Sequence, residues 1–302
     1  MQTVESSVQR AAAWMSGWLV LMVVIAVAGR QAMQELSVFQ IMLMRSVLGL
    51  GLLWPVLHAA GGLAAVRTER LPQHGLRNLV HYAAQYGWFA ALGLIPLAQV
   101  VSIEFTMPIW AAALAVVFLG ERLNRQKLLA VALGLVGVLV IVRPWAGVAS
   151  PAGAVGLGTG SGADVGQLIA LAAALGFAIS VVLVKSLTRT DRAEAVSFWM
   201  LVIQSAIGLL PALWVWHWPS AVVWGWVLLV AFCGTYSHYC FARAMQHADA
   251  TVVVPMDFLR VPLTALAGWL VYGEWVDSFT VLGVALILAG NLLNLRRPAS
   301  KR

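Results

Sequence analysis

The sequence predicts an all-α membrane protein in which ten transmembrane helices form two inverted five-helix repeats around a central cavity. Three observations lead to this prediction: an apolar composition, apolar runs separated by short connectors, and an internal repeat. Of the 302 residues, 61% are hydrophobic and 10% are charged. Soluble domains carry about 25% charged residues. We therefore expect the chain to lie in a lipid bilayer.

The apolar runs are delimited by charged residues, glycine and proline. A helix needs about 20 apolar residues to cross the hydrocarbon core of a bilayer, and each run approaches or reaches that length. The expected spans are residues 11–29, 38–59, 76–94, 97–118, 127–143, 165–186, 194–213, 221–242, 250–271 and 278–295.

The distribution of Lys and Arg predicts the orientation of these spans. The connectors of one side carry fifteen Lys or Arg, with Arg77 counted among them, and the other side has only Arg30 and Arg143. Cytoplasmic connectors carry the basic excess, so both termini are expected in the cytoplasm and the protein in the bacterial inner (plasma) membrane. The net charge of +7 then reflects topology, and no nucleic-acid partner is expected.

The internal repeat relates the two halves of the chain. A shift of 153 residues aligns residues 101–143 with 254–296 and gives 13 identities over 43 positions. The identities include a Gly-Glu pair before the last span of each half, Gly120-Glu121 and Gly273-Glu274. Apolar helices can resemble each other by chance, but chance does not explain why the same Gly-Glu pair stands at the same turn of both halves.

Each repeat has an odd number of spans, so the second must enter the membrane from the face opposite to the first. We expect residues 1–146 to form the first repeat, 147–164 a glycine-rich periplasmic linker, and 165–302 the second repeat. Repeats inverted about an axis in the membrane plane are typical of carriers that work by alternating access.

Four charged residues fall inside expected spans: Arg45, Glu104, Asp257 and Arg260. Each costs about 2.5 to 3.5 kcal/mol at the centre of a helix, so these groups must be paired or face water. Asp257 and Arg260 are three residues apart and can neutralise each other, and Arg45 and Glu104 lie at similar expected depth and could pair. Either a role in coupling or plain ion pairs between helices would explain them.

Polar and aromatic residues inside the spans are the candidates for substrate binding. On the third span they follow the spacing of one helical face, which must turn away from lipid. Packing of the helix bundle is the alternative explanation for each of them. The candidates are His81, Tyr82, Gln85, Trp88, Ser102, Trp110, Trp199, Gln204, Tyr236, His238 and Tyr239.

Pro108 and Pro262 fall one position apart under the repeat shift. A proline in a helix interior removes a hydrogen bond and bends the helix, so both are candidate hinges, with fixed kinks as the alternative.

The composition and motifs argue against catalysis. The sequence lacks a His-Glu-x-x-His motif, a nucleophile elbow and clustered carboxylates, which disfavours a membrane enzyme. No cofactor and no metal ion are expected. The expected partners are a small-molecule substrate and membrane lipid, and the sequence leaves a monomer and a homodimer open.

On its spans, its doubled unit, its two Gly-Glu turns and Arg45, the chain resembles the EamA-like branch of the drug/metabolite transporter superfamily. Within it, the sequence is similar to the YddG-type aromatic amino acid exporters. The resemblance implies a basket of helices around a central cavity and export of amino acids or related metabolites. The second repeat departs from the first in having no Arg at the place of Arg45, which aligns near Met200.

Overall fold

The computed structural model describes residues 4–92, 94, 103–121, 124–142, 161–260, 262–263, 266 and 278–295. Five helices in this part of the chain are long and apolar enough to cross a membrane. They are Ser7–Gly29, Val38–Ala59, Val165–Leu187, Ala193–Trp214 and Ala221–His247, and shorter apolar helices lie at Met107–Leu119, Ala250–Leu259 and Val281–Gly290. The Gly273-Glu274 turn and most of the expected linker lie outside the described residues.

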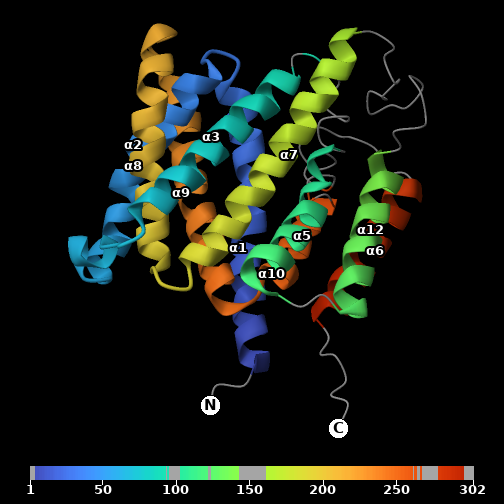
Figure 1. Ribbon diagram of the computed structural model, residues 1–302. Helices are drawn as coiled ribbons and strands as arrows, with labels where there is room; N and C mark the ends of the chain where they lie inside the picture. The colour runs from blue at the N-terminus through green and yellow to red at the C-terminus, as the bar shows by residue number, and fades with distance from the viewer. Residues whose placement is uncertain are drawn as a thin grey trace. The chain divides into compact units, whose positions relative to one another are not determined.

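The chain divides into two compact units, residues 1–82 with 183–248 and residues 83–182 with 249–302 (Figure 1). Two helices, α3 (Leu71–Leu92) and α7 (Ser161–Leu187), contribute to both units. The first unit also contains α1 (Val4–Ala32), α2 (Val38–Ala59), the 3₁₀ helix η1 (Gly62–Val66), α8 (Ala193–Trp214) and α9 (Ala221–His247). The second contains α5 (Met107–Leu119), α6 (Arg125–Val142), α10 (Ala250–Met256), the 3₁₀ turn η3 (Asp257–Leu259) and α12 (Ser278–Leu295).

In the first unit, α2 and α8 lie side by side and run antiparallel (Figure 1). Near the start of α2, the Gln40 side chain accepts a hydrogen bond of 3.0 Å from the backbone N–H of His217, which follows α8. At the other end, the Arg192 guanidinium before α8 donates to the carbonyl of Ala60 at 3.1 Å. These two helices are the second spans of the two halves, so equivalent helices point in opposite directions within this unit.

The last helices of the two halves, α6 and α12, pack against each other in the second unit through glycine. A Cβ at Gly137 would lie 2.7 Å from the carbonyl oxygen of Gly283, and one at Gly290 would lie 2.8 Å from that of Ala130. The 153-residue shift converts the first contact into the second, and the order of the residues makes the two helices antiparallel. Only glycine lets the backbones approach this closely.

The first Gly-Glu turn closes one helix and caps another. Gly120 takes a left-handed conformation, with φ 67°, as the C-cap of α5, a geometry that glycine adopts without strain. The Glu121 carboxylate then accepts hydrogen bonds from the backbone N–H groups of Ala250 and Thr251 at 2.9 and 3.0 Å. Those groups begin α10, and its own N-cap, Asp249, makes no side-chain cap. Glu121 therefore supplies the negative charge that the N-terminus of α10 favours.

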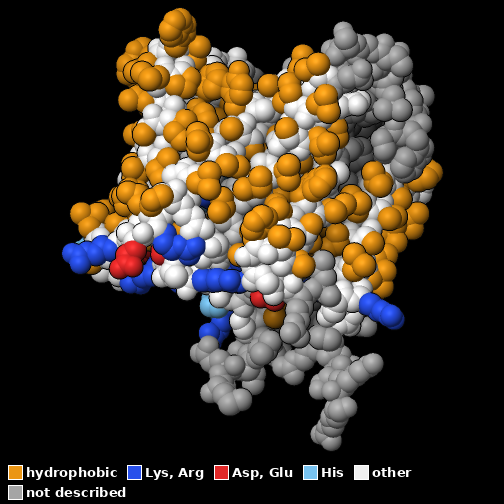
Figure 2. Space-filling view, in the orientation of Figure 1, with side chains coloured by type: hydrophobic (Ala, Val, Ile, Leu, Met, Phe, Trp, Pro, Cys, Tyr) orange, Lys and Arg blue, Asp and Glu red, His pale blue; other side chains and the backbone are white. Residues whose placement is uncertain are grey.

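Large apolar side chains are exposed on these helices, as expected where a helix faces lipid rather than water. Val117 of α5 is 73% exposed, Leu210 of α8 is 78% exposed and Trp214 at its end is 91% exposed. Figure 2 shows hydrophobic side chains over most of the visible face of the helices. In the first unit, Lys, Arg, Asp and Glu side chains gather at the end that carries the connector between α2 and α3.

Candidate functional site

A buried polar cluster joins four helices of the first unit. Arg45 on α2 donates a hydrogen bond of 2.7 Å from Nη2 to Oε1 of Gln204 on α8. Their exposed fractions are 5% and 1%. A guanidinium and an amide buried inside apolar helices cost free energy unless they are paired or bind a ligand, which makes this cluster a candidate site.

Imidazole and phenol groups extend the cluster. The rings of His81 on α3 and His238 on α9 meet edge to face, with centroids 5.5 Å apart, and Trp18 of α1 meets His238 at 5.6 Å. Tyr82 is buried, and its hydroxyl has no hydrogen-bond partner among the described residues. A Cβ at Gly208 of α8 would lie 3.3 Å from that hydroxyl, so the two helices are close here.

Sequence reasoning missed a second arginine in this cluster. Arg77 was expected at the cytoplasmic end of a span, but it lies inside α3 and is only 4% exposed. Its Nη1 donates to Oδ1 of Asn78 at 2.7 Å. The assignment to the connector is wrong because counting basic residues does not distinguish the first turns of a helix from the connector before it. The four-residue spacing to His81 is the signal that could have identified it, since such positions share one helical face.

A glycine makes room for the Arg45 side chain. A Cβ at Gly234 on α9 would lie 2.6 Å from Cδ of Arg45 and 3.1 Å from its Cγ. Carbon atoms that are not bonded to each other do not approach this closely, so an alanine at position 234 would displace the aliphatic part of the Arg45 side chain. The position of the guanidinium therefore depends on α9 as well as on α2 and α8.

A second charged cluster lies in the second unit. Arg260 donates from Nη2 to Glu104 at 2.9 Å and lies 3.1 Å from the Asp257 carboxylate. Trp88 on α3 donates from its indole to the other oxygen of Glu104 at 2.9 Å. The predicted pairing of Asp257 with Arg260 is confirmed, whereas Arg45 was the wrong partner for Glu104. The reason is that Glu104 has a guanidinium inside its own unit at hydrogen-bonding distance.

This charged cluster sits where two equivalent helices are interrupted. The helical turn at residues 103–104 is followed by a turn before α5 begins at Met107, and α10 passes into η3 at Asp257. The rings of Phe105 and Phe258, which the repeat shift makes equivalent, stack with centroids 5.9 Å apart. Interrupted helices in transporters expose backbone groups near the substrate.

The candidate hinge prolines do not kink continuous helices. Pro108 lies in the first turn of α5, where the missing N–H has no helical partner to lose. Pro262 is helical and follows η3, so the interruption precedes it as well. The expectation of a mid-helix kink at Pro108 is wrong because the helix starts there. Interior prolines are found in α2, α8 and α10, at Pro55, Pro211 and Pro255.

Several predicted binding residues form hydrogen bonds within the protein. Trp199 donates to the carbonyl of Val66 at 2.9 Å, and Tyr236 donates to that of Leu52 at 2.7 Å. Tyr239 donates a hydrogen bond of 3.2 Å to Glu194, and Trp110 donates one of 3.2 Å to Thr106. Gln85 and Trp88 belong to the second unit and therefore not to the first cluster. Ser102 lies outside the described residues.

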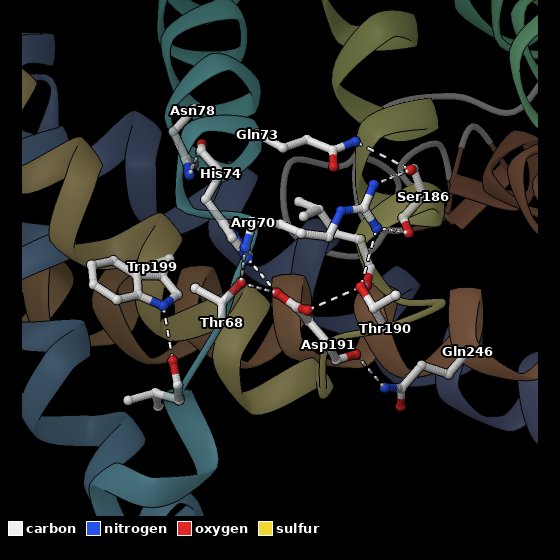
Figure 3. A network of polar contacts seen from close by, with 12 residues as sticks. Thr68, Arg70, Gln73, His74, Asn78, Ser186, Thr190, Asp191, Trp199 and Gln246 are labelled. Atoms are coloured by element: carbon white, nitrogen blue, oxygen red, sulfur yellow. Dashed lines mark hydrogen bonds and ion pairs between the residues drawn. The ribbon is translucent and has the colours of Figure 1, made fainter.

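A polar network fastens the connector before α3 to the turn between α7 and α8 (Figure 3). The Asp191 carboxylate accepts hydrogen bonds from the hydroxyl groups of Thr68 at 2.6 Å and Thr190 at 3.0 Å. It also forms one of 2.8 Å with Nε2 of His74. Burial alone would raise the pKa of Asp191, but hydrogen bonds from Thr68, His74 and Thr190 outweigh it and hold that pKa below its usual range. Arg70 adds bonds of 2.8 Å to the carbonyl and hydroxyl of Ser186.

The site chemistry is that of binding. Among the described residues, no group of three or more His, Cys, Asp and Glu side chains is arranged to hold a metal ion. The first cluster offers guanidinium, imidazole, amide and phenol groups within apolar helices, and the second offers carboxylates held by one arginine. Apolar spans with buried polar clusters and interrupted helices define a polytopic membrane transporter.

The profile of the EamA-like transporter family matches residues 9–143 and again residues 164–296. The chain therefore belongs to the EamA-like transporter family, which makes it a membrane transporter and not an enzyme.

Known proteins of this kind differ in the cargo that their names state. The riboflavin transporter of Rhizobium johnstonii is 31% identical over 78% of this chain and 74% of its own length. The pseudopaline exporter CntI of Pseudomonas aeruginosa is 23% identical over 86% of each chain. A crystal structure with 20% sequence identity superposes with a TM-score of 0.80 over 94% of this chain and 95% of that chain, which shows the shared fold.

Proposed function

We propose that the chain is an alternating-access carrier for a small metabolite with an aromatic ring system. The observation that carries this proposal is the buried cluster of Arg45, His81, Gln204 and His238, drawn from four helices of one unit. Such a mixture of flat rings and hydrogen-bonding groups suits a flat, partly polar solute, which it would bind by stacking and a few hydrogen bonds.

Alternating access requires two halves of opposite orientation, and the helix directions support that requirement. The equivalent pairs α2 with α8 and α6 with α12 each run antiparallel. An inverted pair of repeats produces this arrangement, whereas two repeats in the same orientation would make equivalent helices parallel. In this proposal residues 1–146 and 165–302 are the two repeats, and both termini lie in the cytoplasm.

Riboflavin is the first substrate to test, because the relative at 31% identity is named for it. Its tricyclic ring would stack on the imidazole and aromatic groups of the first cluster. Aromatic amino acids are the second candidate, favoured by the buried Arg45, whose guanidinium can bind a carboxylate. The direction of transport under this proposal is outward for amino acids, as the resemblance to exporters implies.

The proposal is tested by flux through liposomes that contain the purified protein. Vesicles loaded with unlabelled riboflavin or tryptophan should accumulate the labelled compound from outside by exchange, and protein-free vesicles should not. His81→Ala removes a ring from the cluster and should lower the flux about 5- to 150-fold, from the loss of about 1 to 3 kcal/mol of binding free energy.

His58→Ala is the matched control, because His58 is exposed near the end of α2 and should leave the flux unchanged. Failure of the wild-type protein to exchange any aromatic solute in the panel would refute the proposed function.

A further inference from the structure

Two arginines of the first unit are buried with most of their hydrogen-bond donors unused by the residues that the structure describes. Arg45 and Arg77 are 5% and 4% exposed, and each lies within electrostatic range of the other. A guanidinium has five N–H donors. Among the described residues, one hydrogen bond is recorded for each, to the amide oxygens of Gln204 and Asn78, and both Nε atoms are without a partner.

Three acidic residues of this unit are engaged elsewhere, and a fourth, Glu69, is exposed in the connector before α3. Asp191 is held by Thr68 and His74, and Glu194 accepts from Tyr239. Glu35 accepts two hydrogen bonds from Ser220. No carboxylate among the described residues forms an ion pair with Arg45 or Arg77.

Other donors around the arginines are also unsatisfied. The Nε2 of Gln204 and the hydroxyl of Tyr82 are buried without a partner in the described part of the chain. The imidazoles of His81 and His238 stand within electrostatic range of both guanidinium groups. The cluster thus presents N–H and O–H groups to one region, and only an acceptor with negative charge can satisfy two cations together.

We infer that Arg45 and Arg77 form an anion-binding subsite, which holds a carboxylate or phosphate group of the transported aromatic solute. This inference rests on the proposed carrier function and adds the charge of its cargo. The ring system would lie against the imidazole and phenol groups while the anion bridges the two guanidinium groups. Cargo without an anionic group would leave the two cations buried and unpaired, so it would bind weakly.

The test compares ligands that differ by the anionic group, using calorimetric titration of the full-length protein in detergent micelles. One pair is riboflavin 5′-phosphate against riboflavin, and the other is tryptophan against tryptamine. In at least one pair, the member that carries the carboxylate or phosphate should bind about ten- to hundredfold more tightly, the range expected for a charge-assisted hydrogen bond. A preference in the first pair alone assigns a phosphate ester, and one in the second alone assigns a carboxylate. Inorganic phosphate should compete with the preferred ligand.

Variants then locate the preference. Arg45→Gln and Arg77→Gln should each reduce the preference at least tenfold, and Arg45→Lys should retain part of it because the charge remains. Arg243→Gln is the matched control, since that arginine faces Glu194 at 3.9 Å and lies outside the cluster. Retained binding of riboflavin, which carries no charge, reports that a variant is folded.

Equal affinities for the two members of both pairs in the wild-type protein would overturn the inference, and this result does not require any variant to fold. An unchanged preference in both glutamine variants would also overturn it. Liposome flux separates this failure from that of the proposed function. Exchange of riboflavin with no anion preference refutes the subsite alone, whereas the absence of flux for every solute refutes the carrier.

Discussion

At the scale of single residues, the buried polar groups described in this protein divide into those that the protein satisfies fully and those that it satisfies only in part. Asp191 belongs to the first kind, since three donors surround its carboxylate. Arg45 and Arg77 belong to the second kind, because their donors outnumber the acceptors described around them. Satisfied groups stabilise the fold, and buried groups that are only partly satisfied are the candidates for contact with a substrate.

Asp191→Asn should lower the free energy of unfolding by about 1 to 3 kcal/mol at pH 7, because an amide cannot accept from all three donors. The pKa of Asp191 is lowered in the folded protein, so its contribution is present above the ordinary aspartate pKa and lost as the pH falls through the lowered value. The difference between variant and wild type in detergent should be constant from about pH 5 to 8 and shrink below about pH 4.

Glu69→Gln is the control for this measurement, because Glu69 is exposed in the connector before α3, next to Thr68 of the same network. A difference between Asp191→Asn and wild type that persisted undiminished at pH 3 would contradict the role assigned to the ionised carboxylate.

The sequence was sufficient to select most residues of the first cluster, but not to group them. A polar side chain inside an apolar span is a reliable signal, and it identified Arg45, His81, Gln204 and His238. It did not distinguish these from Trp199, whose indole bonds to the Val66 carbonyl, because hydrogen-bond partners depend on tertiary packing. The same limit explains why Glu104 was given the wrong arginine.

At the scale of elements, the Gly-Glu turn explains how α5 and α10 are joined. The sequence identified the turn by its repetition, but its purpose depends on the N-terminus of a helix about 130 residues away. Glu121→Ala removes both hydrogen bonds and the charge at that N-terminus. We expect a loss of about 1 to 2 kcal/mol in the free energy of unfolding, measured by thermal denaturation in detergent.

Glu121→Gln keeps one acceptor oxygen and should lose less than Glu121→Ala does. Equal stability of the alanine variant and the wild-type protein would show that α10 does not depend on this cap.

The glycine contact between α6 and α12 gives a second prediction at this scale. Gly137→Ala places a methyl group 2.7 Å from a carbonyl of α12, so the helices must separate. The free energy of unfolding should fall by about 1 to 3 kcal/mol, and Gly290→Ala should have a similar effect because its contact is the equivalent one. Thermal denaturation in detergent measures both.

Gly225→Ala is the matched control, since a Cβ at this glycine of α9 would meet nothing within 4 Å. If Gly137→Ala were as stable as Gly225→Ala, the close approach of the two helices would be disproved.

At the scale of the whole molecule, hydropathy and repetition predicted helices that the structure contains. The third expected span has the weakest apolar signal. The helix found there, α3, is not among those apolar enough to cross a membrane by composition alone, because polar residues such as Arg77 and His81 interrupt its apolar residues. Arg77 and His81 belong to the candidate site, so polar residues that weaken the apolar signal of this helix also contribute to the buried cluster. The interrupted helices at residues 105–106 and 257–259 were missed because local sequence resembles a continuous span there.

The most direct test of opposite threading uses two equivalent connectors of the first unit. Glu69→Cys lies between α2 and α3, and Trp218→Cys lies between α8 and α9, in a protein whose native Cys233 and Cys240 are buried. A membrane-impermeant thiol reagent added to intact cells should label Cys at 218 and not Cys at 69. Labelling of both positions from the same side of the membrane would contradict the inverted repeat and, with it, the account of alternating access.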